Sequence, residues 1–292
     1  MRTRTAKGSR TVFAHVGICL LATAGLGATS WTPSDAQSGF NPVVIRGAGQ
    51  ANSGVLRLAY EASFPNGSLD GSVDHLALGP MVPGDPLIPD SNPTVSALPG
   101  EILVSVHRPD GLSPDLTPSE SVWALPVNFG PGSVFRISAT FRAPVGPLPG
   151  GGFAIGVNAR TGAKDDLTTE TRIAATVNVR PGFLVRFGVP FGSVDPARVV
   201  LPDAVKEAIF SAKNPQPFTI TLTVDRVHGT GLAKLTVSDQ VFSVPFVLSD
   251  FLADSGPLIT AVGPGIAVNS NAPGQTASVH VRNFRIYADV GG

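Results

Sequence analysis

The stretch Phe135-Arg-Ile-Ser-Ala-Thr-Phe141 places an apolar side chain at every second position and a polar one between them. Successive side chains of a β-strand point to opposite faces, so this alternation predicts a strand with one buried and one solvated face. The same alternation recurs in Phe153-Ala-Ile-Gly-Val157, Ile173-Ala-Ala-Thr-Val177, Phe183-Leu-Val-Arg-Phe187, Phe218-Thr-Ile-Thr-Leu-Thr-Val224 and Val279-His-Val281. Half-buried antiparallel sheets produce this pattern. The predicted fold class is therefore all-β, an antiparallel β-sandwich.

The segments between these runs are rich in Gly, Pro, Asp and Asn, which favours turns that join many strands. Helical periodicity is confined to Asp203–Lys213, with Asp203 as the expected cap after Pro202, and to a shorter run at Val247–Ala253. The Pro-rich segment 79–100 lacks strand alternation and is predicted to be an extended loop. An interdomain linker is the alternative, but the segment before it is short for an independent core. We therefore expect one sandwich domain over residues 37–292.

The last predicted strand changes its register. Its apolar positions are Val279 and Val281, followed by Phe284 and Ile286, so that Arg282 and Asn283 fall together between them. One extra residue in a strand is a β-bulge, and we predict one at this point.

Three C-terminal segments carry a likeness to a known superfamily. They are Phe218-Thr-Ile-Thr-Leu-Thr-Val-Asp225, Ala233-Lys-Leu-Thr-Val237 after a Gly-containing turn, and Ser278-Val-His-Val-Arg-Asn-Phe-Arg-Ile286. Over roughly residues 120–288 the pattern resembles the concanavalin A-like lectin and glucanase superfamily. The resemblance implies a jelly roll of two curved antiparallel sheets, with a concave face that often receives a glycan.

The N-terminal segment has the order of a secretory signal. Basic residues precede an apolar stretch, Val12–Ala28, and small residues at Ser34 and Ala36 predict cleavage after Ala36. A membrane anchor is the alternative, but the stretch is short and Gly-rich for a span. The single cysteine, Cys19, would leave with this signal, so we expect a secreted or periplasmic, cysteine-free mature chain, as in a bacterial exoprotein, without a membrane span. Formal net charge is +0, which argues against nucleic-acid binding.

The sequence contains no recognised catalytic string. The Glu-x-Asp-x-x-Glu pattern of glucanases is missing, and the nearest cluster of acids, Asp165, Asp166 and Glu170, falls in a predicted solvated loop. Lyases of this fold use an arginine with a Tyr or His, but His280 reads as an ordinary strand residue that faces solvent or makes a hydrogen bond. We predict no cofactor and assign no metal ligand, while structural calcium held by scattered oxygens stays open.

Polar residues on the predicted non-core face form the candidate site. They are Arg136, Asn158, Arg172, Asn178 and Arg186. Arginine and asparagine offer forked hydrogen bonds that suit sugar hydroxyls and carboxylates, which points to a glycan, including an anionic one. A solvated outer face is the alternative. Trp123 alternates with apolar residues and is predicted to lie in the core instead of stacking on a sugar.

The leading hypothesis is a non-catalytic, exported binding or surface-associated module with a carbohydrate ligand. A polysaccharide hydrolase or lyase whose groups meet only in space is the first alternative. A structural or adhesive exoprotein is the second. The sequence leaves the oligomeric state open.

Overall fold

A computed structural model describes a discontinuous set of residues. These are residues 45–46, 56–62, 64, 94–110, 119–123, 125–146, 148, 150–161, 172–189, 198–250, 258–268 and 272–289. The chain separates into two units, Met1–Ser30 and Trp31–Gly292, and all described residues belong to the second. The predicted signal peptide and cleavage site, Cys19, and the acids Asp165, Asp166 and Glu170 lie outside the described residues.

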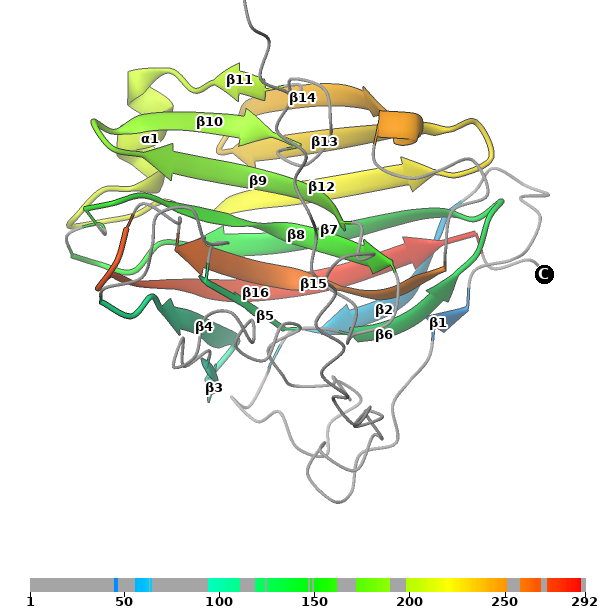
Figure 1. The fold of residues 1–292 in the computed structure, drawn as a ribbon, viewed down its shortest axis with the longest axis horizontal. Coiled ribbons are helices and arrows are strands. Elements are labelled where there is room, and N and C mark those ends of the chain that lie inside the picture. Colours follow the sequence, from blue (N-terminus) through cyan, green and yellow to red (C-terminus); the bar gives the residue numbers. More distant parts are fainter. Residues whose placement is uncertain are drawn as a thin grey trace, which may run out of the picture. The chain divides into compact units, whose positions relative to one another are not determined.

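Two eight-stranded sheets make up the described part of the chain, and they form two layers, one in front of the other in Figure 1. Sheet 1 has the strand order β1-β6-β15-β8-β9-β10-β11, with β5 also paired to β15. Its strands are β1 (Ile45–Arg46), β5 (Ser119–Val122), β6 (Leu125–Phe129), β8 (Phe153–Thr161), β9 (Arg172–Arg180), β10 (Leu184–Gly188), β11 (Arg198–Val200) and β15 (Ile259–Val268).

Sheet 2 forms the second layer and has the order β14-β13-β12-β7-β16-β4-β3, with β2 also paired to β16. Its strands are β2 (Arg57–Ala62), β3 (Thr94–Leu98), β4 (Glu101–His107), β7 (Val134–Arg142), β12 (Phe218–Asp225), β13 (Thr230–Val237), β14 (Gln240–Val247) and β16 (Thr276–Ala288). Among the described strands, every pair is antiparallel except β1 with β6, which run parallel. The predicted antiparallel β-sandwich is confirmed.

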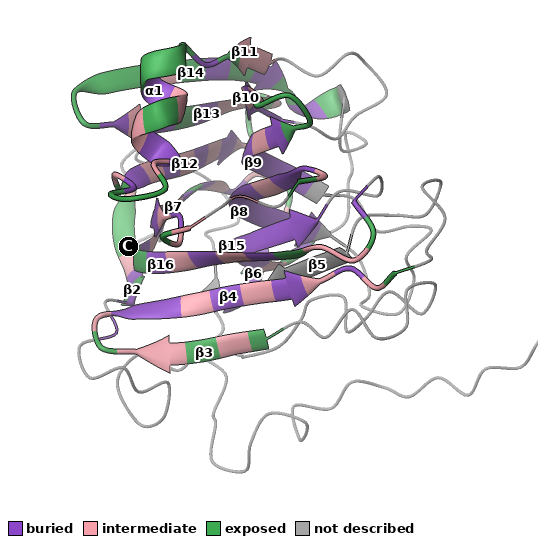
Figure 2. Ribbon diagram, turned by 90° about the vertical axis from the view of Figure 1, so that its left-hand side faces the viewer, coloured by how far each residue is buried: buried purple, intermediate pink, exposed green. Residues whose placement is uncertain are grey.

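The core between the sheets is made of the apolar members of each alternating run. On β7, Phe135, Ile137, Ala139 and Phe141 are fully buried, and the residues between them are not (Figure 2). Aromatic rings join the layers, as where Trp123 lies 4.8 Å from Phe64 and 5.8 Å from Phe284, measured between ring centroids. Trp123 is 1% exposed, as its alternation predicts.

The sequence misplaces some boundaries. Residues 94–98 of the segment predicted as a Pro-rich loop form β3, which pairs with β4 from Thr94↔Ser105 to Leu98↔Glu101. Strand β3 begins at Thr94, after the last proline that precedes Pro99. Its residues do not alternate between apolar and polar because it is an edge strand, in which few side chains are buried. Residues 79–93 lie outside the described residues.

Both predicted helices are shorter than expected. Helix α1 spans Asp203–Ile209, and a 3-10 turn at Leu248–Asp250 replaces the second. Asp203 is not the cap: Pro202 holds that position, without a side-chain cap bond, and Asp203 instead pairs with Lys206.

The β-bulge in the last strand is confirmed. Between Arg282 and Arg285 the register of β16 against β7 shifts, and Asn283 takes a left-handed φ of 49°. The extra residue returns Phe284 and Ile286 to the core while Arg282 and Asn283 both stay exposed.

Candidate functional site

Three of the five predicted site residues, Asn158, Asn178 and Arg186, share the outer face of sheet 1, and Arg172 is the first residue of β9. Asn158 lies on β8, Arg172 and Asn178 on β9, and Arg186 on β10. In register, Arg186 is opposite Asn178, while Asn158 is opposite Ala174 and Arg172 is opposite Arg160. The structure therefore brings Asn178 and Arg186 side by side, and places Asn158 and Arg172 farther along the same strands.

Arg136 does not belong with them. It lies on β7 and faces outward from sheet 2, on the opposite side of the sandwich. Its Nε donates to Oγ1 of Thr223 at 3.2 Å, and its guanidinium lies 6.0 Å from the ring centroid of Tyr287. Alternation identifies the face away from the core, but both layers of a sandwich have such a face, and the sequence does not tell them apart.

Small residues occupy the centre of the outer face of sheet 1. Across β15, β8 and β9 the register aligns Ala267 with Ala154, Gly265 with Gly156, and Gly263 with Asn158. A Cβ added to Gly156 would lie 2.3 Å from the carbonyl oxygen of Ala175, so no side chain fits there. We call the set Ala154, Gly156, Ala174, Gly263, Gly265 and Ala267 the small-residue floor. The close approach of the neighbouring strand β9 therefore explains the glycine at position 156.

Two polar atoms beside the floor lack hydrogen-bond partners among the described residues. Asn178 Oδ1 and Arg186 Nε are both buried, and they belong to directly paired positions. Buried polar atoms are nearly always bonded, and one left without a partner costs about 1–3 kcal/mol. An acceptor and a donor on neighbouring strands are thus placed to bind a ligand that carries both hydroxyls and acceptor oxygens.

Sequence reasoning missed two residues of this face. Thr176 and Arg160 follow the same period of two, from Asn178 and Asn158 respectively, and are 7% and 5% exposed. Thr176 lies within the apolar run Ile173–Val177, so it did not stand out as a polar site residue. Arg160 lies near the end of β8, beyond the alternating run Phe153–Val157 from which the strand was predicted. Extending the period along the whole strand would have found both.

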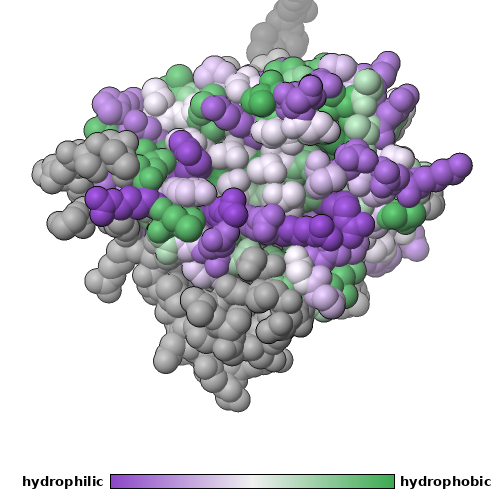
Figure 3. All heavy atoms as spheres, turned by 180° about the vertical axis from the view of Figure 1, so that it is seen from behind, coloured by the Kyte–Doolittle hydropathy of each residue, from purple (hydrophilic) through white to green (hydrophobic). Residues whose placement is uncertain are grey.

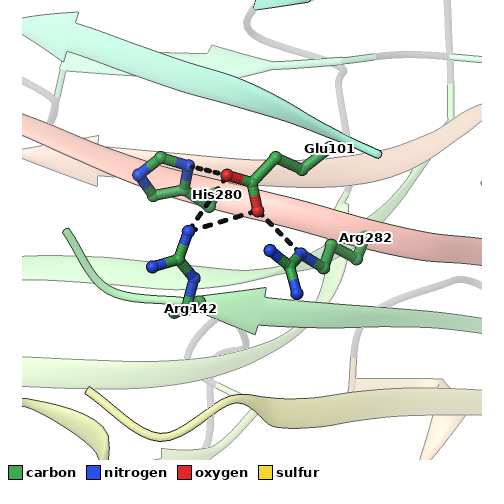
Figure 4. A network of polar contacts seen from close by, with 4 residues as sticks. All are labelled: Glu101, Arg142, His280 and Arg282. Carbon is green, nitrogen blue, oxygen red and sulfur yellow. Dashed lines mark hydrogen bonds and ion pairs between the residues drawn. The ribbon is translucent and has the colours of Figure 1, made fainter. Parts of the chain in front are cut away.

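A second polar cluster lies on the outer face of sheet 2, where two arginines and a histidine surround one carboxylate (Figure 4). Glu101 from β4 accepts from Arg142 Nη2 of β7 at 3.0 Å and from Arg282 Nε of β16 at 2.7 Å. His280 Nδ1 of β16 lies 2.8 Å from Glu101 Oε1, but out of line for a hydrogen bond. The Glu101 side chain is only 9% exposed. Sequence patterns do not predict this cluster, because Glu101 and Arg282 are 181 positions apart.

The cluster shifts two pKa values. Burial alone would raise the pKa of Glu101, but the hydrogen bond from Arg282 and the charges of His280, Arg282 and Arg142 outweigh burial and lower it. Burial lowers the pKa of His280, and the two arginines add to this, while Glu101 opposes it. The carboxylate is therefore ionised and His280 is predominantly neutral at neutral pH.

Neither a metal site nor a membrane-spanning helix occurs in the residues that the structure describes. No three His, Cys, Asp or Glu side chains gather there in a way that could hold a metal ion. None of the helices in that part has the length and apolar character needed to cross a bilayer.

No protein-family model and no curated protein matches the sequence. Solved structures do align with it. Lectin I-B4 from Griffonia simplicifolia covers 79% of this chain and 100% of its own, at 16% identity and a TM-score of 0.46. The CBM2 module of the evolved Dit protein of Lactobacillus casei phage J-1 covers 81% of this chain and 98% of its own, at 11% identity and a TM-score of 0.48. A family 7 alginate lyase in complex with product covers 65% of this chain and 80% of its own, at 15% identity and a TM-score of 0.45.

The antiparallel β-sandwich rests on the two sheets described above, and the resemblance to the concanavalin A-like superfamily stays a prediction. Identities of 16% and below and TM-scores below 0.5 carry no argument about ligand or activity. Function must be argued from the faces of the sandwich.

Proposed function

We propose that the protein is an exported, non-catalytic carbohydrate-binding module whose glycan lies on the outer face of sheet 1. The observation that carries the proposal is the pair of buried, unbonded polar atoms, Asn178 Oδ1 and Arg186 Nε, beside the small-residue floor. A sugar ring presents hydroxyl groups that both donate and accept, so one ring can bond to an amide oxygen and a guanidinium together.

A non-catalytic role is supported by the sequence, which lacks the spaced carboxylates of the glucanases. Export is supported by the basic and apolar order of the first 36 residues. If the chain is exported as proposed, the protein recovered from culture medium or periplasm begins at Gln37. A protein that keeps residues 1–36 would contradict this part of the proposal.

The binding test uses a glycan array followed by calorimetry on the glycans that bind. Arg186→Gln and Asn178→Ala each remove one of the two groups, and loss of a hydrogen bond to a charged group weakens binding by roughly ten-fold or more. The control is Lys213→Gln, an exposed cation outside both sheets. Its affinity should equal that of the wild type.

Two results would contradict the proposal. One is the absence of any glycan ligand at millimolar concentration. The other is product in reducing-sugar or unsaturated-uronate assays with the same glycans, because either product means that the module is catalytic.

A further inference from the structure

Four arginines form a row along the outer face of β7 and β16. The register pairs Arg142 with His280, Thr140 with Arg282, Ser138 with Arg285, and Arg136 with Tyr287, so each paired row carries one arginine. We call Arg136, Arg142, Arg282 and Arg285 the basic stripe. Arg136 and Arg142 are six residues apart on one strand, which makes the stripe roughly 20 Å long.

The β-bulge builds this row. Without the bulge, with Asn283 counted in a strict alternation from His280 and Arg282, Phe284 and Ile286 would point outward and Arg285 toward the core. With it, His280, Arg282, Arg285 and Tyr287 all share the outer face. The bulge therefore keeps the apolar core intact and lengthens the row of cations at the same time.

Three of the four arginines are held by their inner nitrogens, whereas Arg142 donates from Nη2 to Glu101. Arg282 donates from Nε to Glu101, Arg285 from Nε to Glu61 at 2.7 Å, and Arg136 from Nε to Thr223. These contacts fix each guanidinium plane and leave the outer Nη groups for another molecule. The Arg282 and Arg285 side chains are 45% and 42% exposed, so a ligand can reach them.

Hydroxyl groups lie alongside the row. Ser138 is hydrogen-bonded to Thr221 and Thr140 to Thr219, so that β7 and β12 carry a ladder of hydroxyls next to the arginines. Figure 3, which views the molecule from behind, shows a band of strongly hydrophilic side chains beside a paler area on this face. The face thus combines a line of positive charge with neutral hydrogen-bonding groups.

We propose that the basic stripe is a second binding site, on the opposite layer from the first, for a linear acidic polysaccharide. Its anionic groups bond to the outer Nη atoms of the arginines, and its hydroxyls bond to the serine and threonine ladder. The length of the row fits an oligosaccharide better than a single sugar. The site does not depend on the function proposed for sheet 1, since no residue is shared.

A nucleic acid fits this face less well. Glu101 and Glu61 stand within the row and repel the anionic groups of either polymer, but a carboxylate can also accept bonds from hydroxyls, which a polysaccharide carries on every sugar. Tyr287 is the aromatic ring of the row, and Arg136 already covers it at 6.0 Å. Base stacking, which binds single strands, therefore lacks an open platform there.

The experiment measures binding of the full chain to polygalacturonate, heparin and dextran by calorimetry at 50 and 200 mM salt. Polygalacturonate carries carboxylates, heparin also carries sulfates, and dextran is neutral. We expect binding to one or both polyanions, weaker at the higher salt, and none to dextran. The double variant Arg282→Gln/Arg285→Gln should bind at least ten-fold more weakly.

Two controls make the test specific. Lys234→Gln removes an exposed cation from β13 of the same sheet but outside the stripe, and should change the affinity less than two-fold. Arg186→Gln on sheet 1 should leave polyanion binding unchanged, so that failure of one site is distinguished from failure of the other. Thermal unfolding measures whether each variant is folded. If the double variant is not folded, the single variant Arg285→Gln replaces it in the binding measurement, because its partner Glu61 is 38% exposed and the lost ion pair lies at the surface.

Three results would overturn the proposal. They are no binding to either polyanion at 50 mM salt, an equal loss in Lys234→Gln and in the double variant, and a single-stranded oligonucleotide that binds as tightly as the polysaccharides through the same arginines.

Discussion

Arg282 donates from its Nε to Oε2 of Glu101 across 2.7 Å and so joins the last strand of the chain to a strand 181 positions earlier. The same carboxylate also receives Arg142 and lies beside His280 (Figure 4). One nearly buried anion therefore holds β4, β7 and β16 together on the outer face of sheet 2. Its removal leaves three basic groups without a counter-charge.

Glu101→Gln should lower the free energy of unfolding by about 1–3 kcal/mol, because hydrogen bonds to charged groups are lost and the cations face one another. Urea unfolding at pH 7 measures this. The control is Glu61→Gln, whose carboxylate is 38% exposed and should contribute less than about 1 kcal/mol. Equal effects in the two variants would show that the cluster is an ordinary surface ion pair.

Acid should destabilise the protein in two stages. The pKa of His280 is lowered from its ordinary value of 6.5, so the stability that it contributes is complete above pH 6.5 and is lost as pH falls toward the folded value. The pKa of Glu101 is lowered from 4.5, so its contribution is complete above pH 4.5 and is lost below that.

His280→Gln should therefore flatten the decline that begins below pH 6.5 and leave the one below pH 4.5. The measurement is urea unfolding from pH 8 to pH 3. His107→Gln, which removes an imidazole bonded to Thr276 on the neighbouring strand, is the control. A decline that stays as steep in His280→Gln as in the wild type would contradict the account.

The β-bulge gives a prediction about backbone conformation. Asn283 has a φ of 49°, a region that glycine enters freely and that β-branched residues avoid. Asn283→Gly should change stability by less than about 1 kcal/mol, whereas Asn283→Val should cost about 1–2 kcal/mol. Thermal unfolding distinguishes them, and equal midpoints for the two variants would mean that the bulge is not formed in solution.

The aromatic contact between the layers should dominate stability. Phe284 is fully buried against Trp123, so Phe284→Ala should cost about 3–5 kcal/mol. Val241→Ala, at a position that is 58% exposed, should cost less than about 0.5 kcal/mol. Denaturant titration followed by tryptophan fluorescence measures both, and a small loss for Phe284→Ala would contradict the packing of sheet 1 on sheet 2.

Most of the fold follows from local patterns. Alternation in Phe135–Phe141 and Phe218–Val224 predicts two strands. The structure pairs them side by side in one sheet, in a register that begins at Phe218↔Phe141. The bulge was predictable because a change of apolar register is itself a local signal. The edge strand Thr94–Leu98 was not, because an exposed edge needs no buried face and so leaves no alternation to detect.

The candidate site was predicted only in part, for a topological reason. Asn178 and Arg186 come from consecutive strands joined by a short turn, so chain order already places them side by side. Arg136 and Asn158 also come from consecutive strands, β7 and β8, but these belong to different sheets. Period-two alternation carries no information about which layer a strand joins, and the Glu101 cluster depends on pairings that only the complete sheet defines.

Amide chemical-shift mapping during titration with a glycan that the array identifies tests the central claim most directly. If the outer face of sheet 1 binds sugar, the side-chain amide of Asn178, the Nε–H of Arg186 and the backbone amides of β8 to β10 should shift with the ligand. If the shifts instead fall on other parts of the chain, and those groups stay unchanged at saturation, then the small-residue floor is not the binding site.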